Sequence, residues 1–155
     1  MTTLRRELRQ GKPFASLEEM VFLSLLRTGD ALLEGETALL RAPGLSFAKY
    51  NVLRILRGAG TDGLACGEIA GRMVNRDPDI TRLLDRLESR GLVSRTRDAD
   101  DRRVVLARIT AEGLAVLQQL DAPIVHLHRE QLAHMSRKQL RALAGLLEVA
   151  RTPPK

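Results

Sequence analysis

The chain has 155 residues, of which 44% are hydrophobic, so it is long enough for a single domain (residues 1–155) with a buried core. Its formal net charge of +6 favours a polyanionic partner, and its aromatic content of 3% disfavours single-stranded nucleic acid, whose bases stack on aromatic rings. The sequence has no apolar run that could span a membrane, no signal-peptide pattern and only one cysteine, Cys66, which excludes an internal disulfide; we expect a cytoplasmic protein.

The first long helix is expected within residues 14–42, after a polar and basic N-terminal arm. Ser16 and Glu19 have the spacing of a capping box, and the apolar residues that follow are denser than one buried helix face needs. Gly29 and Gly35 have low helix propensity, so a bend or a break is expected at these positions.

The next segment predicts a helix-turn-helix. Ser46 opens a helix that ends near Gly60, and residues 64–65 predict a short strand beside a later hairpin. Residues 66–73 have apolar side chains at helical spacing, and residues 74–76 connect them to a second, amphipathic helix. Two helices joined by a tight turn form the helix-turn-helix arrangement.

The second helix of this pair carries apolar residues at i, i+3, i+4 and i+7, which form one stripe. Asp77 fits the N-cap, Pro78 the first helical position and Gly91 the C-terminal stop. The opposite face is basic and is typical of a helix that enters a DNA groove, although a solvated helix face has a similar composition. Asp79 fits a capping role better than contact with a cytosine amine. The candidate DNA-contacting residues here are Arg76, Asp79, Thr81, Arg82 and Arg86.

A basic hairpin is expected after this helix. Residues 92–96 and 104–109 are short β-prone runs on either side of the charged turn RDADDRR. Acidic residues held between two strands can orient neighbouring arginines, and an oriented arginine can enter a narrow minor groove. The alternative is a solvated, charge-balanced hairpin. The candidate DNA contacts of the hairpin are Arg97, Arg102 and Arg103, with Asp101 as the orienting residue.

Two helices complete the chain. Thr110 caps a long helix that Pro123 is expected to kink or interrupt, and Ser136 with Gln139 forms a capping box for the last helix. The first and last helices are more apolar than a small monomer requires. We therefore expect them to pack against a second subunit, with packing in a monomeric core as the alternative.

The segment from Thr81 to Gly113 resembles the MarR family of bacterial transcription regulators. The resemblance rests on DRLE at 85–88, RGLV at 90–93, the pair Asp101 and Arg103, and Thr110 with Gly113. It implies a mainly α fold with a small β-wing (α+β), in which a winged helix-turn-helix at 46–109 lies between dimerisation helices at 14–42 and 110–150. It also implies a homodimer that binds double-stranded DNA at a pseudo-palindromic operator, most simply as a ligand-responsive repressor.

The same resemblance implies a small aromatic or anionic effector, bound between the dimer helices and the winged part. Arg27 and Tyr50 are weak candidates for its binding residues.

Two alternative functions remain open. One is a winged-helix module for protein–protein contact, and the other is a cysteine-based redox-sensing regulator that uses Cys66, although the sensing cysteine of such family members lies nearer the N-terminus.

The sequence contains no recognisable catalytic or metal-binding pattern. Of the three histidines, His126 and His128 are two residues apart and point to different sides of a helix, and His128 and His134 are too far apart for one turn. HExxH, a glycine-rich phosphate loop and a nucleophile elbow are all missing. An enzyme on a helical scaffold is therefore disfavoured, and we expect no metal and no cofactor.

Overall fold

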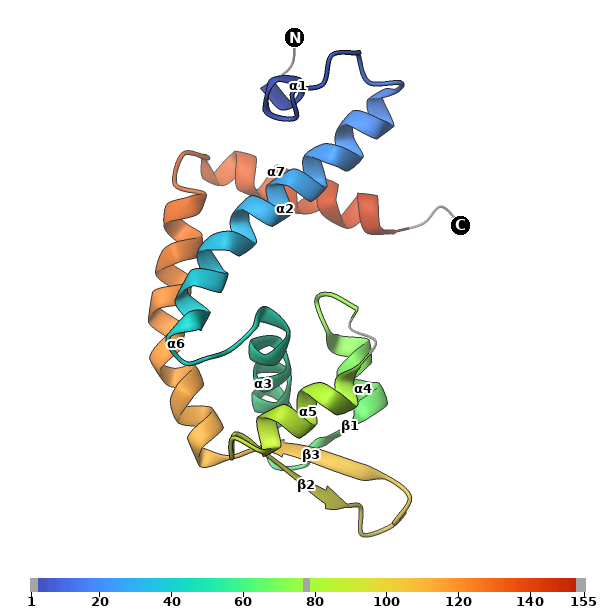
Figure 1. Cartoon of the computed structure of the whole chain (residues 1–155), viewed down its shortest axis with the longest axis vertical. Helices are drawn as coiled ribbons and strands as arrows, with labels where there is room; N and C mark the ends of the chain where they lie inside the picture. Colours follow the sequence, from blue (N-terminus) through green and yellow to red (C-terminus); the bar gives the residue numbers. More distant parts are fainter. Residues whose placement is uncertain (1–2, 77–78, 153–155) are drawn as a thin grey trace.

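The computed structural model describes residues 3–76 and 79–152, which form a mainly helical structure with one small sheet, as the sequence predicted (Figure 1). In chain order the elements are α1 (Thr3–Glu7), α2 (Leu17–Arg41), α3 (Phe47–Ala59), β1 (Leu64–Ala65), α4 (Cys66–Arg72), α5 (Ile80–Glu88), β2 (Val93–Arg97), β3 (Val105–Ile109), α6 (Ala111–Gln131) and α7 (Arg137–Arg151).

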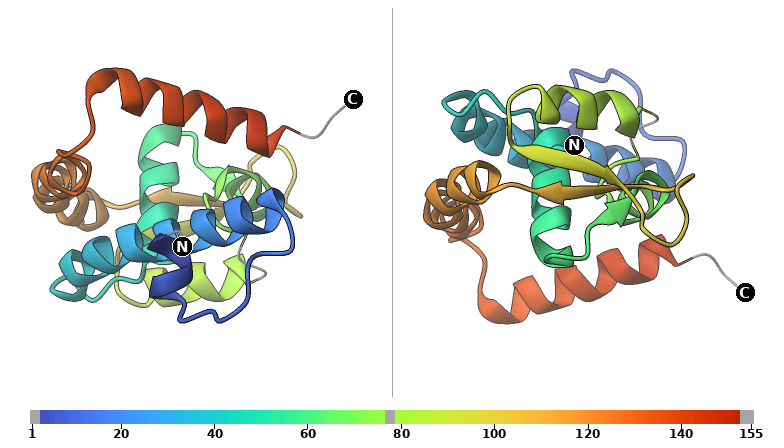
Figure 2. Two further views of the ribbon diagram at one scale, coloured as in Figure 1. Left: turned by 90° about the horizontal axis from the view of Figure 1, so that it is seen from above. Right: turned by 90° about the horizontal axis from the view of Figure 1, so that it is seen from below.

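The elements divide between two ends of an elongated shape (Figure 1). The winged lobe, residues 46–109, contains α3, α4, α5 and the sheet, whereas α2 and α6 run side by side towards the other end. There α7 follows α6; its ribbon overlaps α2 in Figure 1 but lies apart from α2 when seen from above (Figure 2). The buried core is centred on the winged lobe and extends into the adjoining halves of α2 and α6. Its fully buried side chains are Leu40, Val52, Leu53, Leu56, Ile69, Leu84, Leu87 and Leu117.

The sheet is antiparallel, with the strand order β1-β3-β2. β2 and β3 pair from Val93 opposite Ile109 to Arg97 opposite Val105, and they form the predicted hairpin. The two residues of β1, at 64–65, pair with β3 at 106–107, so the short strand predicted beside the hairpin is confirmed. Beyond this pairing the hairpin projects from the body of the lobe (Figure 1).

The predicted break in α2 is wrong, because α2 is one continuous helix of 25 residues, and the alternative of a bend stays a prediction. Ser16 is its N-cap and accepts a hydrogen bond from the amide of Glu19. The carboxylate of Glu19 accepts from the amide of Ala15 and not from that of Ser16, so only half of the predicted capping box forms. A Cβ at Gly35 would lie 2.8 Å from the Nε2 atom of Gln131 and 3.1 Å from a methyl carbon of Leu127. Gly35 therefore serves close packing between α2 and α6, which outweighs its low helix propensity.

α6 continues through Pro123, from Ala111 to Gln131, so the proline does not end the helix. Proline has no N–H, so one hydrogen bond of the helix is missing there, as expected, and a kink stays a prediction. Thr110 caps α6 by accepting from the amide of Gly113 at 3.1 Å. Gly113 packs so closely against the end of the turn after α5 that a Cβ there would collide with the carbonyl oxygen of Leu92 and approach Ile109 to 2.7 Å. The start of α6 is thereby fixed to the base of the hairpin.

The last helix, α7, has the predicted capping box, in which Ser136 and Gln139 exchange hydrogen bonds at 2.8 and 3.3 Å. No residue of α7 is buried, and the side chains of Leu146 and Val149 are about 70% exposed. Phe22 on α2 is also exposed, at 60%. The described segments include no helix with both the length and the apolarity needed to cross a membrane.

Candidate nucleic-acid interface

The helix α5 begins two residues later than predicted. Its N-cap is Asp79, whose Oδ1 accepts from the amide of Arg82 at 3.0 Å, and its first helical residue is Ile80. The expected cap at Asp77 and the expected first position at Pro78 lie outside the described residues. Asp79 thus has the capping role that the sequence favoured for it. At the other end Gly91 has a φ of 70°, a left-handed conformation suited to the predicted helix stop.

The apolar stripe of α5 faces the core of the winged lobe. Ile80, Leu84 and Leu87 are buried, and Leu83 is partly buried. Because one face is fixed in this way, the opposite face is presented to solvent. The apolar pattern of the sequence therefore predicted correctly which face of α5 is buried.

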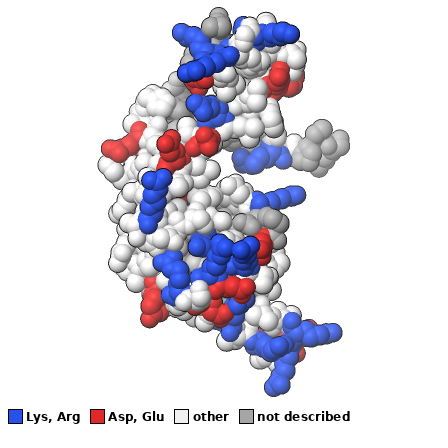
Figure 3. Space-filling view, in the orientation of Figure 1, with Lys and Arg blue, Asp and Glu red and all other residues white. Residues whose placement is uncertain are grey.

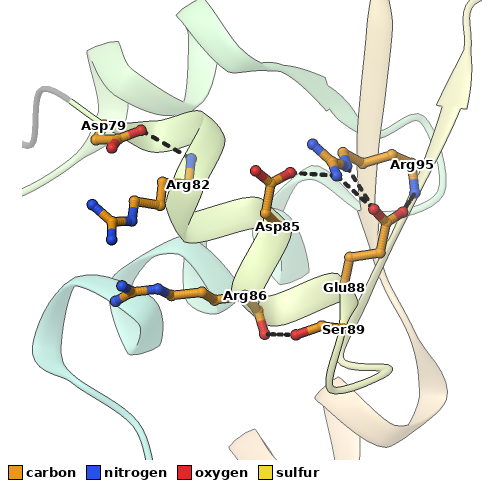
Figure 4. Close-up of polar contacts among 7 residues, drawn as sticks. All are labelled: Asp79, Arg82, Asp85, Arg86, Glu88, Ser89 and Arg95. Carbon is orange, nitrogen blue, oxygen red and sulfur yellow. Dashed lines mark hydrogen bonds and ion pairs between the residues drawn. The ribbon is translucent and has the colours of Figure 1, made fainter.

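Two arginines project from this exposed face. Figure 4 shows the side chains of Arg82 and Arg86 extending to the same side of α5, and within the part of the chain that the structure describes neither guanidinium has a hydrogen-bond or ion-pair partner. Thr81 and Arg76 are exposed close by. Basic side chains gather over the winged lobe and again at the tip of the hairpin (Figure 3). Unpaired, exposed guanidinium groups are suited to phosphate oxygens or guanine edges.

A third arginine, Arg95 of β2, is used differently. Its Nε and Nη2 atoms donate to Oε2 of Glu88 at 2.9 and 2.6 Å, and Nη2 also donates to Oδ1 of Asp85 at 2.6 Å (Figure 4). Its backbone amide donates to the other oxygen of Glu88 at 3.0 Å. The hydrogen bonds from Arg95 lower the pKa of Glu88 below its ordinary 4.5, and Glu88 in turn raises the pKa of Arg95. We call this group the Arg95 clamp; it joins α5 to the wing.

The tip of the hairpin is ordered by its own side chains. Oδ1 of Asp98 accepts from the amides of Asp100 and Asp101 at 2.8 and 2.9 Å. Asp101 accepts from the amide and Nε of Arg103 at 3.0 and 3.2 Å, and these bonds lower the pKa of Asp101. Asp101 thus contacts the arginine that it was expected to orient, while the side chain of Arg103 is 92% exposed.

The other two wing candidates differ in their contacts. Nη1 of Arg97 donates to the backbone carbonyl of Arg102 at 2.7 Å, so Arg97 spans the turn. Arg102 itself is exposed, and over residues 79–152 its side chain has no recorded partner. DNA contact by the hairpin stays a prediction.

Two further polar links tie the winged lobe to the long helices, and the sequence patterns did not indicate either. Arg90 donates to the carbonyl oxygens of Pro43 and Gly44 at 2.6 and 2.8 Å, which ties the end of α5 to the turn after α2. Arg57 of α3 makes two hydrogen bonds, at 2.8 and 2.9 Å, with the carboxylate of Asp121 on α6. The partners in each link are more than 40 residues apart, so no local pattern relates them.

The two weak effector-binding candidates lie in different places. Tyr50 is a buried core residue of α3, and burial raises its pKa above the ordinary 10.0. Arg27 is half exposed on α2, with its Nε 3.8 Å from Glu7. Neither residue lines the cavity of about 350 Å³ that lies between α2, α3 and α6.

That cavity is mainly apolar, with few polar side chains. The carboxylate of Glu36 and the ring of His128 meet there at 3.1 Å, and Asn75, from the turn between α4 and α5, also lines it. Within the described ranges no three His, Cys, Asp or Glu side chains are grouped to hold a metal ion. Cys66, partly buried, is the first residue of α4.

Comparison with known proteins agrees with this architecture. Residues 45–105 match the sequence profile of the MarR family. The HTH-type transcriptional regulator PrsX of Escherichia coli is 30% identical over 122 residues, which cover 76% of this chain and 74% of PrsX. The crystal structure of a MarR transcription factor from Planctomyces limnophilus is 41% identical, with a TM-score of 0.67, and covers 88% of this chain and 99% of that one. The structure of CouR from Rhodococcus jostii RHA1, bound to p-coumaroyl-CoA, is 27% identical, with a TM-score of 0.74, over 92% of this chain and 99% of CouR.

Proposed function

Because this chain belongs to the MarR family and is therefore a DNA-binding transcriptional regulator, we propose that it acts as a homodimeric, ligand-responsive repressor on a pseudo-palindromic operator. One observation carries the DNA-binding part of this proposal. The buried stripe of α5 leaves Arg82 and Arg86 projecting from the opposite face, beside a hairpin with an arginine-bearing tip (Figures 3 and 4).

In the proposed complex α5 lies in the major groove and the hairpin reaches the adjacent minor groove. Arg82 and Arg86 contact guanine edges or phosphates, and Thr81 and Arg76, near the start of α5, contact the DNA backbone. Asp79 holds the first turn of α5, which brings its carboxylate close to the DNA. From the hairpin the proposed contacts are those of Arg97, Arg102 and Arg103.

The exposed apolar side chains of α2 and α7 support the proposal of a homodimer. Phe22, Leu146 and Val149 are each at least 60% exposed, on helices at the end of the molecule away from α5. Burying them against the same helices of a second copy removes this apolar surface from water. Two-fold symmetry then presents two α5 helices to half-sites about one turn of DNA apart.

The cavity between α2, α3 and α6 supports the proposal of an effector, for which we propose a small aromatic or anionic compound. Val74 and Asn75 line this cavity and lie in the turn that leads to α5. A molecule bound in the cavity would therefore contact this turn and affect the position of α5. The related CouR was crystallised with p-coumaroyl-CoA, an aromatic anion. The binding residues proposed for the effector are therefore those of this cavity, in place of Arg27 and Tyr50.

Selection of bound duplexes from a random double-stranded library tests the proposal. We expect enrichment of inverted repeats whose half-sites are about one helical turn apart. Enrichment of no duplex would contradict DNA binding and favour the protein–protein contact module. Enrichment of single, unrepeated sites would contradict the two-fold dimer. Repeating the selection with p-coumarate and related phenolic acids tests the effector, because a ligand that disfavours the DNA-bound form lowers the yield of duplex.

A further inference from the structure

The Arg95 clamp joins the two elements that the proposed function brings to DNA. Arg95 lies on β2, its two acidic partners Asp85 and Glu88 lie on α5, and four hydrogen bonds of 2.6–3.0 Å connect them (Figure 4). The side chain of Arg95 is only 23% exposed, whereas that of Arg103 at the wing tip is 92% exposed. The guanidinium of Arg95 is therefore committed within the protein and not presented to phosphates.

The clamp sits where the hairpin leaves the body of the lobe. Arg95 is opposite Ala107, which is also where β3 pairs with Leu64 of β1. From this point the hairpin extends outward, and the wing candidates at 97–103 lie on the projecting part (Figure 1). A small rotation of β2 against α5 at Arg95 would be amplified at the wing tip.

The acidic partners add a second effect. Asp85 and Glu88 lie on the side of α5 that faces the wing, away from Arg82 and Arg86, and their side chains are 54% and 38% exposed. Without a counter-ion these two carboxylates would repel phosphates close to the proposed interface. The guanidinium of Arg95 offsets one of the two negative charges and holds both groups in place.

We propose that Arg95 is a positioning residue for DNA binding. Without touching DNA, it fixes the position of the wing relative to α5, so that α5 reaches the major groove while the wing reaches the minor groove. This inference rests on the proposed function, since it presumes that both elements contact a duplex. It predicts that loss of the clamp disables the wing contact selectively, while the contact of α5 remains.

The test uses full-length protein and a duplex obtained by the selection described above. In the variant Arg95→Met we expect affinity to fall about tenfold, and hydroxyl-radical protection of the minor groove at the wing position to disappear. Protection of guanine N7 from methylation in the major groove should persist, because α5 keeps Arg82 and Arg86. The slope of log K against log salt should also become shallower by about one unit per phosphate contact that is lost.

The matched control is Arg102→Met, which makes the same change in the same hairpin at an arginine outside the clamp. This variant should lower the salt slope by about one unit and keep the minor-groove protection. Arg95→Lys retains a charge but not the planar set of donors, so we expect partial minor-groove protection.

Each result decides the proposal. Wild-type protection in both grooves of Arg95→Met would overturn it, and so would equal loss in both grooves by a variant whose thermal unfolding is unchanged. If Arg95→Met does not fold, Arg95→Lys decides, and wild-type protection by that variant would count against the clamp. Failure of the wild-type protein to select any duplex would instead contradict the proposed function.

Discussion

The arginines of the winged lobe differ in what their guanidinium groups contact. Those of Arg82 and Arg86 have no partner among the described residues, that of Arg103 is held by Asp101, and that of Arg95 is taken up by Asp85 and Glu88. All of these arginines count equally in the net charge, but only the exposed guanidinium groups are available to a polyanion. The distinction decides which substitutions should change DNA binding directly.

Arg82 provides the test at this scale. If its guanidinium reads a base edge, Arg82→Ala should weaken binding by about 1–3 kcal/mol and lose discrimination at one operator position. Fluorescence anisotropy with a set of singly substituted operator duplexes measures this. A uniform loss on all duplexes would assign Arg82 to a phosphate, and unchanged affinity would remove it from the interface. Its side chain makes no hydrogen bond or ion pair in the described chain, so folding stability should stay within about 0.5 kcal/mol of wild type.

The sequence could predict these residues only in part. The i, i+3, i+4, i+7 spacing was enough to orient α5 and so to expose Arg82 and Arg86, because helix periodicity is a local property. It could not show that Arg95 would pair with Asp85 and Glu88, because that contact depends on how β2 packs against α5. The charge interleaving of the turn did suggest the pairing of Asp101 with Arg103, which are two residues apart.

At the scale of elements, the ends of helices and the contacts between helices were hardest to predict. α5 starts at Ile80 with Asp79 as its cap, although Asp77 is an equally good capping residue by type. Gly35 weakens a helix in isolation, yet α2 is continuous because α6 packs against the bare backbone at that position. At Gly35 a contact from another part of the chain thus outweighed local propensity.

The Arg57–Asp121 pair joins α3 to α6 and gives a prediction in pH. The hydrogen bonds from Arg57 lower the pKa of Asp121 below its ordinary 3.8. The stabilisation is therefore fully present above pH 3.8 and is lost as the pH falls through the lowered value. Asp121→Asn should be less stable than wild type at neutral pH by no more than about 1 kcal/mol, since the carboxylate is 46% exposed.

Urea unfolding of the wild type and of Asp121→Asn, from neutral pH to below pH 3.8, measures the contribution of this pair to stability. The difference in free energy of unfolding between wild type and Asp121→Asn should shrink as the pH is lowered below 3.8. In an Arg57→Met background the Asp121→Asn substitution should have a smaller effect, because the partner is gone. Parallel pH profiles of the two proteins would show that the pair contributes nothing to stability.

At the scale of the whole molecule, the apolar surface is concentrated away from the proposed DNA-binding face. The side chains of Leu146 and Val149 on α7 and Phe22 on α2 are exposed, while the core lies mainly in the winged lobe. Sequence alone suggested this, because the first and last helices carry more apolar residues than one buried face needs. It could not show which of those residues the single chain itself would bury.

Disrupting the proposed dimer should separate dimerisation from folding. Phe22→Asp combined with Leu146→Asp places charges in the apolar surface, so we expect sedimentation analysis to show monomers with a retained helical circular dichroism spectrum. Affinity for a duplex with two half-sites should fall by about a hundredfold or more, because two linked contacts become one.

The control is Leu114→Asp, a change at an exposed apolar residue on α6 beside the winged lobe, which should leave the dimer intact. A double variant that remains dimeric, or that binds the duplex as tightly as wild type, would contradict the proposed arrangement.

The different use made of Arg82, Arg86 and Arg95 also bears on how such a regulator can diverge. A mutation at Arg82 or Arg86 removes no side-chain hydrogen bond or ion pair within the described chain, so natural selection can alter the preferred DNA site at little cost to the fold. A mutation at Arg95 leaves Asp85 and Glu88 without their partner and is penalised whatever the site. After gene duplication, we therefore expect the two copies to differ first at positions 82 and 86, while position 95 keeps its arginine.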